Sequence, residues 1–285
     1  MNISAKREAK FDFLQVLKSK HVAIPGEHGA WIFLLSPLFI GLILGGFSKG
    51  SIPLIFSLLA AFLIRQPVTM LVKIKTGRRT KRDLQPAIFW LLCYSLIAAI
   101  SLFFLLIQGY SFILYLIVPA IPVFLWHLWL VSKRAERRQK LIEVAAGGVL
   151  ALAAPAAFWV GKGDYDPTGW MLWVLCWLQV TGTILYAYLR LQQRQYQNFP
   201  DLRVSFTNAK ESLIFNLSLL VFVSILVWKG WAPPLTPIGF LIQPIEVIWG
   251  IFHPAIKIPP KKIGIRQLII SILFTVVFII SWMVN

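Results

Sequence analysis

Nine apolar stretches, each of about the length needed to cross a bilayer, recur along the 285 residues of this chain. A helix requires about 20 predominantly apolar residues to span the hydrocarbon core, and such runs do not recur in a soluble domain. The stretches cover residues 30–47, 52–71, 87–107, 112–131, 144–160, 170–189, 213–228, 235–252 and 268–284. We therefore expect an all-α integral membrane protein: a single bundle of about nine transmembrane helices over residues 1–285, without a separate soluble domain.

Two of these stretches are weaker than the others. The fifth has only about 17 residues, and the eighth is interrupted by Pro237 and Pro244. Each could be a full span or a re-entrant segment.

Basic residues alternate along the chain in a way that depends on the number of crossings. If all nine stretches cross, all but three of the 28 Lys and Arg residues fall on one side, the exceptions being Lys49, Lys162 and Lys229. Lys and Arg accumulate in cytoplasmic loops. The pattern therefore predicts a cytoplasmic N-terminal segment over residues 1–27, a C-terminus on the opposite side, and a multi-pass protein of a plasma or internal membrane.

The formal charge of +17 has a membrane explanation as well. Most of it sits in short loops between apolar stretches, where anionic lipid headgroups are its natural counterpart. We expect membrane lipids, and not nucleic acid, as partners.

Ionisable and polar side chains gather toward the expected cytoplasmic ends of the spans. Arg65 lies about eight residues before Lys73, roughly 12 Å deeper along a helix, and Gln66 and Pro67 follow it. Ionisable residues inside a membrane mark a cavity or pathway by default, although a snorkelling Arg beside a kink is the simpler alternative. Phe62 and Arg65 also share their spacing and their following basic loop with Phe124 and His127, a weak internal likeness.

A second group lies in the sixth and eighth stretches. Glu246 and His253 are seven residues apart and so share nearly one helical face. Glu246 could carry protons, pair with Arg65, or be a satisfied buried acid. Tyr186, Arg190 and Arg194 occupy the inner end of the sixth stretch and its extension. Asn208 and Glu211 have the spacing of a capping box before the seventh stretch.

A compact motif precedes the first stretch. Glu27 and His28 stand between Pro25-Gly26 and Gly29-Ala30-Trp31. His28 is the side chain best suited to titrate near neutrality, and small residues at 29 and 30 would let another helix approach. An entrance cap with an interfacial Trp is the simplest interpretation.

At this motif the sequence resembles the YwiC-like membrane proteins. The resemblance is carried by Pro25, Glu27, His28, Gly29, Ala30 and Trp31, followed by Leu34, Leu35, Pro37 and Leu38. It covers most of the chain, although the motif is its specific part. The family implies no established activity, so the resemblance draws attention to Glu27 and His28 without giving them roles.

The number of spans and the inner N-terminus also resemble the UbiA prenyltransferases, by topology alone. That family's aspartate-rich motifs would fall near residues 65–73 and 186–194, and neither stretch contains an aspartate. Metal-assisted loss of a diphosphate is therefore not expected, no metal site is predicted, and the cofactor is unknown.

The one-sided polarity favours a pocket over a channel. The middle of the bundle offers little polarity beyond Gln179, Thr181 and Thr183, whereas a transporter binds near the midplane and needs polar paths to both faces. We expect a cytoplasm-facing pocket with a basic mouth and an apolar floor that binds an anionic isoprenoid or lipid. A transporter for a small anion or a proton-coupled solute, and a non-catalytic assembly factor, are the alternatives.

Two sets of site residues follow, whether or not the protein is an enzyme. The candidate catalytic groups, for proton transfer, are Glu27, His28 and Glu246. The candidate substrate-binding residues are Arg65, Gln66, His127, Tyr186, Arg190, Arg194 and His253.

Overall fold

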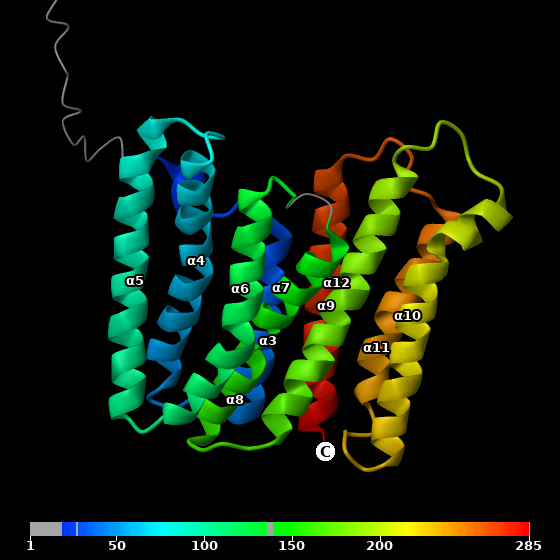
Figure 1. Cartoon of the computed structure of the whole chain (residues 1–285). Helices are drawn as coiled ribbons and strands as arrows, with labels where there is room; N and C mark the ends of the chain where they lie inside the picture. The colour runs from blue at the N-terminus through cyan, green and yellow to red at the C-terminus, as the bar shows by residue number, and fades with distance from the viewer. Residues whose placement is uncertain (1–18, 27, 136–138, 285) are drawn as a thin grey trace, which may run out of the picture.

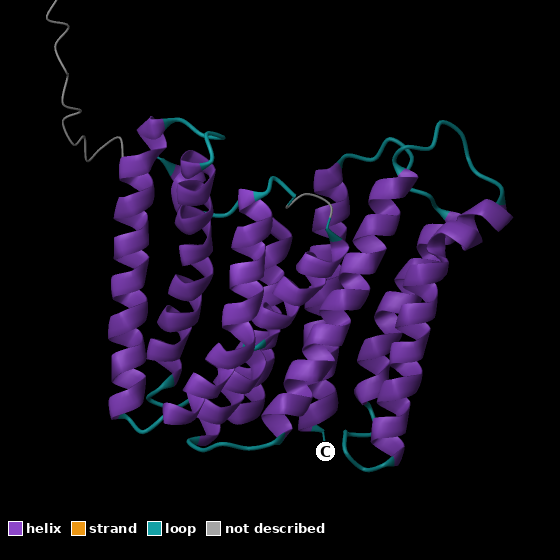
Figure 2. Ribbon diagram, in the orientation of Figure 1, coloured by secondary structure: helices purple, strands orange, loops and turns teal. Residues whose placement is uncertain are grey.

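The computed structural model describes residues 19–26, 28–135 and 139–284, and within these ranges the regular secondary structure is entirely helical (Figure 2). Its elements are α2 (Lys20–Ala23), α3 (His28–Gly45), α4 (Ser51–Lys75), η1 (Lys81–Asp83), α5 (Leu84–Ile107), η2 (Ser111–Leu116), α6 (Ile117–Ser132), α7 (Lys140–Ala151), α8 (Ala153–Lys162), α9 (Thr168–Gln193), α10 (Leu202–Trp228), α11 (Thr236–Phe252) and α12 (Pro260–Met283).

Within the described residues, seven helical stretches are long and apolar enough to cross a membrane. They are Ser51–Lys75, Lys81–Ile107, Ser111–Ser132, Lys140–Lys162, Thr168–Gln193, Leu202–Trp228 and Pro260–Met283, and the shorter apolar helices Gly29–Gly45 and Thr236–Phe252 stand beside them. Large apolar side chains cover the outer faces; Leu92 of α5, for example, is 64% exposed. The chain is thus a multi-pass integral membrane protein, as predicted, while the number of nine crossings and the orientation stay predictions.

The loops expected to be cytoplasmic lie together. In Figure 1 the connections α4–α5, α6–α7, α9–α10 and α11–α12 are all at one end of the bundle, and α12 ends at the other. This is the arrangement that the alternation of basic residues requires.

The fifth stretch is broken into two helices in the middle of the bundle. α7 ends at Ala151 and α8 starts at Ala153, with Pro155 in its first turn. Proline has no N–H to give to the carbonyl four residues earlier, and its ring crowds that carbonyl, so the helix bends here. Residues 151–160 are buried throughout, which makes this stretch part of the core.

Glycines set the close contact between α3 and α8. A Cβ on Gly41 would lie 2.7 Å from Ala157 Cβ, and one on Gly45 would lie 2.5 Å from the carbonyl oxygen of Phe158. Because glycine has no Cβ, the backbones of α3 and α8 can pack at this short distance. At Gly29, where a small residue would also allow a close approach, no described atom lies within 4 Å of the Cβ position.

The helix of the seventh stretch begins earlier than predicted. α10 starts at Leu202, so Asn208 and Glu211 lie within it and do not cap it. Asn208 Nδ2 instead donates to Tyr196 Oη at 2.6 Å, and Glu211 pairs with Lys140. The capping interpretation was wrong because the polar first turns of α10 continue the helix beyond the apolar run.

Candidate functional site

A cavity of about 420 Å³ lies among α3, α4, α5, α6 and the α7–α8 segment. Small side chains create its volume, among them Ala61 of α4, Ala98 and Ala99 of α5, Ala120 of α6 and Ala153 of α8. Three of its described lining residues are polar, namely Ser57, Arg65 and His127, and the rest are apolar. Its size is that of a small-molecule pocket.

The two basic side chains of the cavity come from different helices. Arg65 of α4 and His127 of α6 each follow a lining phenylalanine, Phe62 and Phe124, by three residues and so continue that helical face inward. Both are half-buried and belong to the halves of their helices nearest the basic loops. The opposite end of the cavity is closed by apolar residues, including Leu116 of η2. The cavity therefore has a basic end and an apolar end.

The side of the cavity between α5 and α6 is not closed by packing of these two helices against each other. α5 packs along α4 and also contacts α2 and η1, but it has no comparable contact with α6. Ala99 and Leu102 of α5 face Val123 and Phe124 of α6 across the cavity. This side is bounded by helices that do not pack against each other, which is why the volume is not filled.

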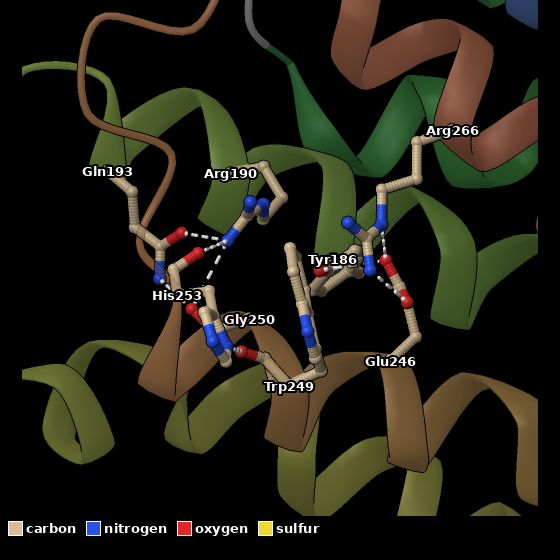
Figure 3. A network of polar contacts seen from close by, with 8 residues as sticks. All are labelled: Tyr186, Arg190, Gln193, Glu246, Trp249, Gly250, His253 and Arg266. Atoms are coloured by element: carbon tan, nitrogen blue, oxygen red, sulfur yellow. Dashed lines mark hydrogen bonds and ion pairs between the residues drawn. The ribbon is translucent and has the colours of Figure 1, made fainter.

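A separate polar network joins α9, α11 and α12 (Figure 3). Arg266 donates two hydrogen bonds to the Glu246 carboxylate, from Nε to Oε1 and from Nη2 to Oε2, the latter at 2.9 Å. Tyr186 Oη donates to the same carboxylate at 3.2 Å. Glu246 therefore forms its ion pair with Arg266 and not with Arg65.

Arg190 stands next to this ion pair but has different partners. Its Nη1 donates to Gln193 Oε1 at 2.8 Å and to the carbonyl oxygens of Gly250 and His253 at 3.2 and 2.7 Å. These carbonyls end α11, where the helix dipole is negative, so a guanidinium is stabilised there. Arg190 is only 3% exposed, yet each of these three acceptors is neutral.

Trp249 separates the two arginines. The Arg266 Cζ lies 3.4 Å from the Trp249 ring centroid and the Arg190 Cζ lies 5.4 Å from it, and Figure 3 shows the ring standing between them. The His253 ring stacks on Trp249 with centroids 4.6 Å apart. The aromatic ring attracts both cations and holds them apart.

The remaining predicted residues lie elsewhere. Gln66 Nε2 donates to the His21 carbonyl at 2.7 Å and so ties α4 to α2. Arg194 Nε donates to the Ile258 carbonyl at 2.6 Å and holds the α11–α12 loop. Glu27 and the side chain of His28, the first residue of α3, lie outside the described residues.

The predicted residues thus form two groups. Arg65 and His127 share the first cavity, whereas Tyr186, Arg190, Glu246 and His253 belong to the second network. The network also contains Arg266 and Trp249, which sequence reasoning missed. Arg266 was counted as a loop charge because α12 begins at Pro260, eight residues before the expected start of the span.

Among the described residues, no three or more His, Cys, Asp or Glu side chains gather as metal ligands. The first cavity has two basic side chains in an otherwise almost wholly apolar lining, and the second network combines two arginines with the Glu246 carboxylate.

Known proteins resemble this chain at the level of sequence. Residues 24–158 match the YwiC-like protein family. Over 254 residues the chain is 27% identical to the protein named "Uncharacterized protein YwiC" of Bacillus subtilis (strain 168), an alignment that spans 89% of this chain and 95% of that protein. No solved structure matches. The match to this family, which covers somewhat less than half of the chain, includes every lining residue of the first cavity.

Proposed function

We propose that this protein binds an anionic lipid, of the isoprenoid or acyl class, in the cavity between α4, α5 and α6. One observation carries the proposal: Arg65 and His127 line the basic end of a cavity that is otherwise almost wholly apolar. An amphipathic ligand matches this division, with its tail among alanines and phenylalanines and its headgroup at the two basic side chains.

The headgroup chemistry follows from these two residues. A guanidinium has a rigid fork of donors that fits a phosphate or carboxylate in two-point contact, so Arg65 is the main anchor. His127 adds an imidazole N–H donor from α6. If the basic loops face the cytoplasm, the headgroup lies on the cytoplasmic side.

The test is mass spectrometry of lipids that co-purify with the protein in mild detergent. We expect an anionic lipid with the wild type and a loss of most of it in Arg65→Gln and in the Arg65→Gln/His127→Gln double variant. Arg65→Lys keeps the charge without the fork and should retain an intermediate amount. Gln66→Ala is the matched control, because Gln66 binds the α2 backbone.

A cavity-filling variant tests the tail separately. Ala99→Phe places a ring between α5 and α6 and should exclude the lipid even with Arg65 intact, whereas Leu92→Phe on the exposed face of α5 should not. The absence of anionic lipid from the wild type, or its equal retention in Arg65→Gln and Ala99→Phe, would rule out this site.

A further inference from the structure

A second, smaller cavity lies between α9, the end of α11 and the start of α12. Its volume is about 220 Å³, and it shares no lining residue with the first cavity. Three basic side chains line it: Arg190, Lys262 and Arg266. Tyr186 and Trp249 complete its polar and aromatic wall.

The positive charges of this cavity are only partly balanced. Arg266 is paired with Glu246, but Arg190 donates to a neutral amide and to the carbonyls at the end of α11. Lys262 is exposed and lies one helical turn before Arg266. Among the described residues, three cations therefore face one carboxylate, and an anion entering the cavity would be attracted by the difference.

A buried amide gives an independent indication of a ligand. Gln267 lines the same cavity and is 7% exposed, and neither its Nε2 nor its Oε1 has a hydrogen-bond partner in the part of the chain that the structure describes. Leaving both ends of a buried amide unpaired is unfavourable. A bound polar group would satisfy the amide.

We propose that this cavity is a binding site for a compact oxyanion, a phosphate or carboxylate group held by Arg190, Lys262, Arg266 and the amide of Gln267. The oxyanion is either free in solution or the headgroup of a lipid, since both present the same oxygens. The site is distinct from the lipid cavity and does not depend on it, because Arg65 lies in a different set of helices.

The arrangement explains how the site stays open. Trp249 lies between the two guanidinium groups, and Glu246 with Tyr186 fixes the plane of Arg266. Arg190 is fixed by the end of α11. The donors are therefore positioned before the anion binds, which lowers the entropy lost on binding.

The test uses the purified full-length protein in phosphate-free buffer with two probes. One arm titrates inorganic phosphate, and the other uses nanodiscs of phosphatidylcholine with or without phosphatidic acid; thermal stability and phosphate binding are measured in both. We expect saturable stabilisation of the wild type. Stabilisation by inorganic phosphate identifies a free oxyanion, and stabilisation by phosphatidic acid alone identifies a headgroup.

Variants connect the effect to the cavity. Lys262→Gln should weaken phosphate binding roughly tenfold, as expected for loss of one charged donor, while Lys261→Gln, its exposed neighbour outside the lining, should not. Gln267→Leu should weaken phosphate binding by less than Lys262→Gln does, because it removes a neutral group, and it should not lower the basal stability, since the amide is unpaired. No response of the wild type to either probe, or an undiminished response in Lys262→Gln and Gln267→Leu, would overturn the proposal.

Discussion

Arg266 of α12 grips the carboxylate of Glu246 on α11 with two hydrogen bonds, so that the last two apolar helices are joined by an ion pair at their basic-loop ends. The Glu246 side chain is 7% exposed, and that of Arg266 is 38% exposed. Removing either partner should destabilise the protein by about 2 kcal/mol, less than the ~3–5 kcal/mol of a fully buried pair, because water reaches Arg266. Thermal unfolding of Glu246→Gln and Arg266→Gln in detergent measures this.

The Lys140–Glu211 pair between α7 and α10 is the control for this effect. Both of its side chains are largely exposed. Lys140→Gln and Glu211→Gln should change stability by at most about 1 kcal/mol. Equal losses at the two pairs would contradict a special role for the α11–α12 ion pair.

Replacing a glycine at the contact between α3 and α8 with alanine should destabilise the protein. Gly45→Ala places a Cβ against the backbone of Phe158, which cannot move aside as a side chain would, so the helices must separate. We expect a loss of about 1–3 kcal/mol, typical of overpacking. Gly264→Ala in α12 meets open space and should be neutral or slightly stabilising. Thermal unfolding of both variants measures the difference. A melting temperature of Gly45→Ala equal to or above that of Gly264→Ala would contradict the prediction.

The orientation of the bundle can be tested with single cysteines. In a background of Cys93→Ala/Cys176→Ala, an impermeant maleimide should label Lys229→Cys in intact cells. Lys81→Cys and Lys133→Cys, both exposed in basic loops, should react only after the membrane is opened. Labelling of Lys81→Cys and Lys133→Cys from opposite sides would refute the predicted topology.

Acidification should weaken the turn between α8 and α9. The hydrogen bond from Lys162 Nζ, at 2.5 Å, is the main cause that lowers the pKa of Asp166 to about 2 from an ordinary 3.8, and the Thr168 backbone N–H adds to it. A carboxyl group whose pKa is lower in the folded protein than in the unfolded chain stabilises the fold at pH values above the unfolded-state pKa. This stabilisation is lost as the pH falls through the folded-state pKa. The melting-temperature advantage of wild type over Asp166→Asn should therefore shrink between about pH 4 and pH 2.

Asp164 in the same turn provides the control. Its carboxylate accepts a hydrogen bond from the backbone N–H of the neighbouring Tyr165. Asp164→Asn should follow the wild-type dependence on pH. If the melting-temperature difference between the wild type and Asp166→Asn did not change with pH, the stability of the turn would not depend on the charge of Asp166.

The sequence was informative about helices because lipid leaves few alternatives. A backbone in hydrocarbon must satisfy its own hydrogen bonds, so an apolar run of spanning length is a helix, and all nine runs are helical. Polar extensions were less predictable. α10 continues through the polar segment 202–212, which hydropathy assigned to a loop.

The site was predictable only in part, for a geometric reason. Arg65 and His127 could be singled out by depth and by their shared spacing from a phenylalanine, but nothing in one sequence states that α4 and α6 face a common cavity. The partner of Glu246 was hidden in the same way, because Arg266 is 20 residues away on another helix. Roles for Glu27 and His28 stay predictions.

The lack of packing between α5 and α6 has a consequence for how a ligand would enter the first cavity. Because α5 packs against α4 and not against α6, the side of the first cavity between α5 and α6 would face the lipid tails once the protein is in a membrane. A long-tailed molecule could slide in sideways from the leaflet without ever being dissolved in water. Its occupancy would then follow its mole fraction among the surrounding lipids, so short, water-soluble mimics should compete poorly however well their headgroups fit.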